Sequence, residues 1–231
     1  MEVAGFIQVF NNMLKKSWLV LFSLLILSCN REEIADLGLD YFPIDSSLFR
    51  VYDVVETTYV NGVENIENYQ LRESISDQIE INVTSYVLLI ERRDDPSENW
   101  RSIETIAIRR TNRILEYREG NKSFLKLSFP VSDGRIWDGN ANNDDTEAIY
   151  IYYGLDQEIP FNNNEHIKVI ISDLPANIVE QDERFEIYGK GIGLVERDFK
   201  QITFCQQDCS GINEPQDGAI LNQRLIEYGS F

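Results

Sequence analysis

The sequence is poor in the residues that most often carry out nucleophilic catalysis and bind zinc. Its 231 residues include one histidine, His166, and three cysteines. A serine hydrolase needs a histidine beside its nucleophile, and no Gly-x-Ser-x-Gly motif is present. A tetrahedral zinc site needs four ligands, more than Cys205, Cys209 and His166 supply. The composition therefore argues against both kinds of site.

Basic residues are also few. The chain has 21 lysines and arginines against 39 aspartates and glutamates, a net charge of -18. Nucleic acids and anionic lipid surfaces repel such a chain, because binding to them depends on clustered cations. We therefore expect no nucleic-acid partner. The charge favours solubility, and an acidic surface for cations or a basic partner is the alternative interpretation.

No hydrophobic run is long enough to cross a bilayer as a helix. The apolar run Trp18–Leu27 has ten residues, against roughly 20 for a transmembrane helix. Lys15 and Lys16 precede it, which is typical of a secretory signal peptide. We predict a signal peptide over residues 1–28, with translation starting at Met13.

The end of this run resembles a bacterial lipobox. The letters "ILSC" end at Cys29. In a lipobox the chain is cut before this cysteine, which is acylated. Arg31, Glu32 and Glu33 follow it, which resembles the surface-export signal of Bacteroidota lipoproteins. Acylation would anchor the chain to the outer membrane without a spanning helix. We therefore expect the membrane to be a partner through the lipid on Cys29.

The other two cysteines lie close together in "FCQQDCSG". With Cys29 acylated, Cys205 and Cys209 form an even remainder in an exported chain, which predicts a disulfide. Residues 29–40 are interpreted as the lipidated cysteine and a tether. Residues 41–231 show no linker or repeat and are predicted to form one domain.

This domain carries strand signals almost throughout. Runs rich in β-branched and aromatic residues alternate with short turns, and Asn61-Gly62 is a strong hairpin signal. We predict a mostly β, single antiparallel domain of about ten strands, as a strongly bent sheet, a sandwich or a barrel-like form. The glycines of Gly189–Gly193 precede a strand instead of a helix, which predicts a tight turn and not a phosphate loop. The expected strands cover 49–60, 66–74, 79–92, 100–110, 113–118, 123–129, 148–153, 165–172, 183–188, 192–204 and 219–228.

A polar loop after Trp137 is the one candidate metal site. Oxygen ligands alternate at Asp138, Asn140, Asn142 and Asp144, which suits weak binding of Ca²⁺. The loop lacks the glycine and the glutamate that an EF-hand requires at its sixth and twelfth positions. The alternative is a loop whose Asn and Asp side chains bond their own backbone. No other cofactor is expected, and Trp137 is predicted to be a core anchor.

Five blocks resemble a family of uncharacterised Bacteroidota lipoproteins. They are "YFPID", "FPVSDGRIWDGN", "YGKGIGLVERDF", "CQQDCSG" and "LIEYG", in this order along the chain. The chain departs from the family after the first block, where members carry a glycine and a tryptophan. The resemblance implies an envelope location and a mostly β fold, and it brings no catalytic residues.

Three hypotheses for function follow. The first is a non-enzymatic, monomeric binding or structural module on the outer membrane, with an envelope protein or a glycan as partner. The second is a carrier for a lipid or another amphiphile, with an apolar cavity in a curved sheet. The third is a hydrolase of glycan or peptidoglycan, which requires two close carboxylates, one with a perturbed pKa.

Overall fold

The computed structural model describes residues 36–76, 85–154, 165–207, 209 and 211–231. They belong to the compact unit Asp36–Phe231, whereas the unit Met1–Ala35 lies outside the described residues. The predicted signal peptide, the lipidation site and the export residues therefore lie outside them too. Within the described part of the chain, no helix is long and apolar enough to cross a membrane.

The described unit is one antiparallel sheet, which confirms the predicted mostly β, antiparallel class. It has twelve strands where about ten were expected, together with the 3-10 helix η1, Leu39–Tyr41. The strands are β1 Leu48–Val60, β2 Val63–Ser76, β3 Ser85–Arg93, β4 Arg101–Arg110, β5 Ile114–Glu119, β6 Lys122–Ser128, β7 Ile136–Asp138, β8 Ile149–Tyr153, β9 His166–Leu174, β10 Glu180–Gly189, β11 Gly193–Phe204 and β12 Pro215–Ser230.

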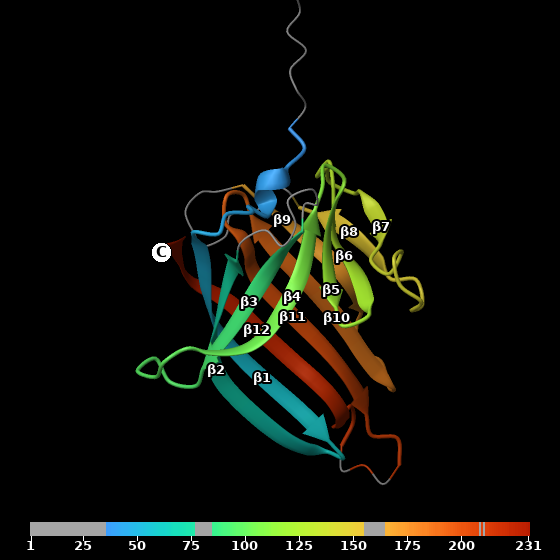
Figure 1. The fold of residues 1–231 in the computed structure, drawn as a ribbon. Coiled ribbons are helices and arrows are strands. Elements are labelled where there is room, and N and C mark those ends of the chain that lie inside the picture. The colour runs from blue at the N-terminus through green and yellow to red at the C-terminus, as the bar shows by residue number, and fades with distance from the viewer. Residues whose placement is uncertain (1–35, 77–84, 155–164, 208, 210) are drawn as a thin grey trace, which may run out of the picture. The chain divides into compact units, whose positions relative to one another are not determined.

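Strands that follow one another in the chain lie side by side, except for β6 and β7. The order is β6-β5-β4-β3-β2-β1-β12-β11-β10-β9-β8-β7. The first and last strands pair with each other, from Leu48 opposite Ser230 to Tyr59 opposite Gly218. The two sheet edges, β6 and β7, are consecutive in the chain. As Figure 1 shows, the sheet curls so strongly that these two edges approach each other.

Side chains and one backbone bond join the two edges. Leu125 N donates to Gly139 O at 2.8 Å, and the Trp137 indole donates to Leu125 O at 2.9 Å. The Tyr152 hydroxyl lies 2.9 Å from both the backbone N and O of Ser128. The sheet is therefore barrel-like and nearly closed, with a seam between β6 and the β7–β8 pair.

Two predicted turns form as expected. Asn61 and Gly62 adopt positive φ angles of 51° and 76° between β1 and β2, as a tight hairpin requires. Gly191 and Gly193 have positive φ angles in the turn between β10 and β11. A Cβ at Gly193 would clash with the guanidinium of Arg50. The glycine-rich block therefore makes a turn and leaves room for a buried arginine.

The inner face of the sheet holds the core. Helix η1 lies at one end of the strands (Figure 1), and the adjacent Phe42 is fully buried and packs edge-on against Tyr117 at 6.0 Å. Large side chains fill the interior beyond it, in agreement with the twofold alternation of strands. The buried cluster includes Tyr52, Val54, Ile75, Leu88, Ile106, Ile108, Leu115, Leu127, Phe129, Tyr150, Tyr152, Ile167, Val169, Tyr188, Leu194 and Leu225.

Candidate functional site

A set of polar side chains lies inside this apolar core, and we call it the interior cluster: Lys126, Glu186, Tyr188, Arg197 and Gln223. Glu186 on β10 is opposite Arg197 on β11, and Arg197 is opposite Gln223 on β12. Directly paired residues of neighbouring strands point to the same face of a sheet. Three adjacent strands therefore place these side chains together on the inner face.

Glu186 is the centre of the cluster and is fully buried. Its Oε1 accepts from Lys126 Nζ at 2.8 Å and from Arg197 Nε at 2.9 Å. Its Oε2 accepts from the Tyr188 hydroxyl at 2.7 Å. Both carboxylate oxygens are thus bonded, and two cations balance the buried charge.

These contacts decide the charge state of the cluster. Burial alone would raise the pKa of Glu186, but Lys126 and Arg197 lower it to about 2. Burial raises the pKa of the Tyr188 hydroxyl well above its usual value, and the neighbouring Glu186 raises it further. Glu186 is therefore a carboxylate at neutral pH. A general acid needs the opposite shift, so the arrangement does not suit proton donation by Glu186.

A second buried carboxylate, Glu73, lies on β2. Glu73 is 4% exposed, and its Oε2 lies 3.1 Å from the Tyr52 hydroxyl. The residue opposite Glu73 on β1 is Arg50, which is 1% exposed. Arg50 Nε donates to Ile192 O, and its guanidinium lies 5.2 Å from the centroid of the Phe42 ring.

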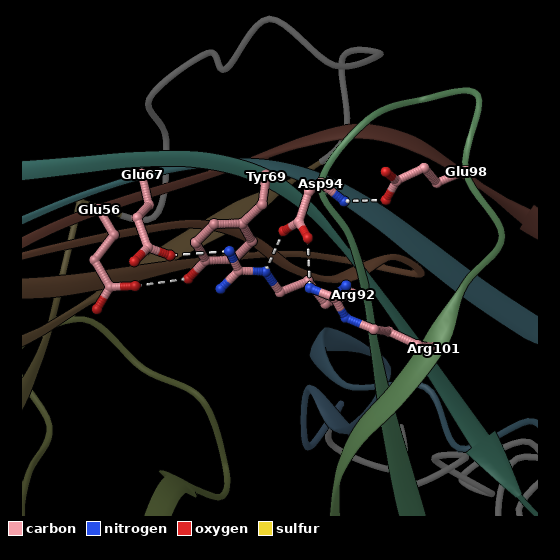
Figure 2. A network of polar contacts seen from close by, with 7 residues as sticks. All are labelled: Glu56, Glu67, Tyr69, Arg92, Asp94, Glu98 and Arg101. Atoms are coloured by element: carbon pink, nitrogen blue, oxygen red, sulfur yellow. Dashed lines mark hydrogen bonds and ion pairs between the residues drawn. The ribbon is translucent and has the colours of Figure 1, made fainter.

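The end of the sheet opposite η1 carries a second polar network, drawn in Figure 2, which we call the rim network. Arg92 is its centre: Nη2 bonds Glu67 at 2.9 Å and Nε bonds Asp94 at 2.7 Å. The guanidinium stacks 3.8 Å from the centroid of the Tyr69 ring, and Tyr69 donates to Glu56 at 3.0 Å. Its ion-pairing side chains are partly exposed, with 24% for Arg92 and 48% for Glu67.

We call the end of the inner face that lies opposite η1 the open end, because no described helix covers it. On β10, β11 and β12 it carries Arg184, paired with Asp182 at 2.7 Å, and the half-buried Phe199 and Leu221. A cavity of about 470 Å³ lies at the ends of these strands. Its lining is Glu180, Gln181, Asp182, Gln201, Ile202, Thr203, Asp217, Gly218 and Ala219. The open end thus combines charged, aromatic and aliphatic side chains.

Three of the four predicted calcium ligands make hydrogen bonds to other groups of the protein. Asp138 Oδ1 accepts from the backbone N of Asn140 and of Ala148, both at 2.9 Å. Asn140 Nδ2 donates to Thr146 O, and Asn142 Nδ2 donates to Glu116 at 3.0 Å. Asp144 lies exposed in the same loop. Over the described ranges, no group of three or more His, Cys, Asp or Glu side chains is arranged to hold a metal ion.

The remaining predicted residues are placed as follows. The Cys205 and Cys209 sulfurs are 2.11 Å apart and form the expected disulfide. Trp137 packs against the rings of Tyr150 and Tyr152 at 5.8 and 4.4 Å, as expected of a core anchor. The lone His166 is buried at the start of β9, with 4% exposure.

Sequence reasoning missed the interior cluster. Lys126 in "SFLKLS" and Glu186 in "RFEIYG" have apolar residues on both sides, whereas Arg197 in "GLVERDF" lies between Glu196 and Asp198. A single charge at an inward position of a strand is a signal of buried pairing, because an unpaired buried charge is costly. That signal could have identified Lys126 and Glu186 but not their partners.

Comparison with known proteins adds no functional information. The chain matches no protein-family model, no curated protein and no solved structure. Its resemblance to envelope lipoproteins therefore depends on the sequence blocks alone.

Proposed function

We propose that the chain is a non-enzymatic binding module of the bacterial cell envelope. In this proposal a lipid on Cys29 anchors it to the outer membrane, facing the cell surface. The chain acts as a monomer and takes up its ligand at the open end of the curled sheet.

The state of the interior cluster is the observation that carries this proposal. Glu186 is bonded by three side chains and has its pKa lowered to about 2. A hydrolase of glycan would need one carboxylic acid with a raised pKa in its cleft. The interior around Glu186 is also occupied by large side chains such as Tyr52 and Tyr188. Both features argue against acid catalysis by Glu186 and favour binding over hydrolysis.

The open end has the composition of a ligand-binding surface. It presents the ring of Tyr69 and the side chains of Phe199 and Leu221 beside the charged groups of Arg92 and Arg184. Binding sites commonly combine apolar contact area with a few placed polar groups. These side chains are part-exposed, so a ligand can reach them.

The anchor is tested by replacing the acylated residue. Cys29→Ala should abolish labelling by radioactive palmitate and release the protein from the membrane fraction. The double variant Cys205→Ala/Cys209→Ala is the matched control, because it leaves Cys29 in place and should still be labelled. Membrane association of unlabelled Cys29→Ala protein would contradict the lipid anchor.

Binding at the open end is tested on full-length protein purified from its own envelope. Native mass spectrometry should find a small molecule that is released on denaturation. The double variant Phe199→Ala/Leu221→Ala should lose it, whereas Val55→Ala, at a position 41% exposed on the outer face of β1, should retain it. The bare protein mass in every sample would count against an open-end site.

A further inference from the structure

Two buried side-chain nitrogens lack a hydrogen-bond partner among the described residues: Arg50 Nη1 and Gln223 Nε2. An unpaired buried donor costs about 1–3 kcal/mol of stability, so native structures rarely retain one without a reason. Gln223 belongs to the interior cluster and is 1% exposed. Its missing acceptor is the starting point for a ligand site.

The orientation of the Gln223 amide follows from its neighbour. Gln223 Oε1 accepts from Arg197 Nη1 at 3.2 Å. The reversed amide would place two donors against each other, because a guanidinium has no acceptor. Nε2 is therefore the atom that faces away from Arg197. It lies on the inner face, since Val54, the residue opposite Gln223 on β1, is a core residue with 1% exposure.

The charges around this amide are unbalanced. Within the interior cluster, Lys126 and Arg197 share a single carboxylate, that of Glu186. Two cations against one anion leave one positive charge in excess in the cluster, in a chain whose net charge is -18. A buried net charge is unfavourable unless a counter-charge accompanies it. An anionic group is the complement that both the charge and the free donor favour.

The two cations of the interior cluster are not packed against protein on every side. The side chain of Arg197 is 20% exposed and that of Lys126 is 12% exposed, although Glu186 between them is fully covered. Phe199 and Leu221 form the next inward-facing pair after Arg197 and Gln223 in the direction of the open end. Gln201 and Ala219 form the pair after that. Gln201 and Ala219 line the cavity of about 470 Å³. Phe199 and Leu221 therefore lie between this cavity and the pair Arg197 and Gln223.

We propose that the interior cluster binds the carboxylate group of a small ligand whose apolar body lies against Phe199 and Leu221. Gln223 Nε2 donates to one carboxylate oxygen. The guanidinium of Arg197, which also holds Glu186, supplies the positive charge and a donor for the other oxygen. This inference rests on the proposed binding at the open end and specifies the chemistry of the ligand.

The test uses full-length protein and three probes of one shape and different charge. Phenylacetate, phenylacetamide and phenethylamine are titrated by isothermal calorimetry. Phenylacetate should bind at least about ten times more tightly than the amide, because a charged acceptor strengthens each hydrogen bond. The amine should not bind.

Two substitutions assign the binding to Gln223. Gln223→Met removes the donor at nearly constant volume and should weaken phenylacetate binding by about tenfold. Gln223→Glu adds a repelling charge and should abolish it. Gln70→Met is the matched control on the outer face of β2 and should bind as the wild type does. If the Gln223 variants do not fold, binding is measured by NMR on the wild-type protein. Phenylacetate should then shift the side-chain amide resonances of Gln223 more than phenylacetamide does.

The outcomes separate this inference from the proposed function. Equal binding of phenylacetate and phenylacetamide, lost in Phe199→Ala/Leu221→Ala but unchanged in Gln223→Met, would overturn the carboxylate site and retain binding at the open end. Absence of phenylacetate binding together with unmoved Gln223 resonances would also overturn the carboxylate site. A neutral ligand purified with the wild-type protein would then still support the proposed function.

Discussion

The interior cluster and the rim network use the same residue types at two depths of one inner face. Glu186 is held by Lys126 and Arg197 and is fully buried. Glu67 is held by Arg92 and has a side chain that is 48% exposed. The distances are alike, 2.8–2.9 Å in each case. The two networks therefore differ in the burial of their carboxylates and not in the lengths of their ion pairs.

Burial determines what the loss of a partner costs. A buried ion that loses its partner has no water to replace it, so the cost reaches about 3–5 kcal/mol. An exposed ion is solvated again and screened by salt, so the cost is about 0–1 kcal/mol. The comparison predicts that equivalent substitutions at the two depths will differ severalfold in their effect on stability.

The largest effect is expected for Glu186→Gln. The substitution keeps the shape of the side chain but leaves Lys126 and Arg197 without a counter-charge in the interior. The free energy of unfolding at pH 7, measured in urea, should fall by about 3–5 kcal/mol. A loss below about 1 kcal/mol would show that the two networks are energetically alike.

The pH dependence of stability should be the next largest effect. The pKa of Glu186 is about 2 in the folded protein, below the ordinary 4.5. Its contribution is therefore complete above about pH 5 and is lost as the pH falls towards 2, by roughly 3 kcal/mol. Urea unfolding of the wild type between pH 7 and pH 2 measures this loss, and Glu186→Gln should show a correspondingly smaller loss. Equal slopes for both proteins would assign the acid sensitivity elsewhere.

Removal of one neutral donor from the cluster should have an intermediate effect. Tyr188→Phe deletes the hydroxyl that donates to Glu186 at 2.7 Å and keeps the ring in the core. Hydrogen bonds to charged groups contribute about 1.5–3 kcal/mol, and a similar loss is expected in urea unfolding. Tyr69→Phe, which removes the bond to Glu56 in the rim network, is the control and should cost less.

The smallest effect is expected for Glu67→Gln. Its ion pair with Arg92 is half exposed, so the loss of stability should stay below about 0.5 kcal/mol and diminish further in 1 M salt. Unfolding midpoints in urea at low and high salt measure this difference. A loss comparable to that of Glu186→Gln would remove the distinction between the two depths.

The parts of the fold that depend on local chemistry could be predicted from the sequence. Asn61-Gly62 specifies a hairpin through the φ angles of two adjacent residues. Cys205 and Cys209, the two cysteines that remain once Cys29 is set aside, form the predicted disulfide. Strand β7 was missed because its three residues lie in a polar, turn-rich block and form a strand only against β8. The cluster was missed because Lys126 and Glu186 are 60 residues apart and meet only once the sheet has curled.

The pairing of the first strand with the last has a consequence for how the protein folds. The β1–β12 ladder joins the two ends of the domain and lies in the middle of the strand order. Until the sixteen residues of β12 are in place, β1 and β11 each expose an unpaired edge. Contacts so distant along the chain slow folding, and free edges promote aggregation while they persist. A chain lacking its final strand therefore resembles two separate half-sheets, and the last strand is the one that joins them.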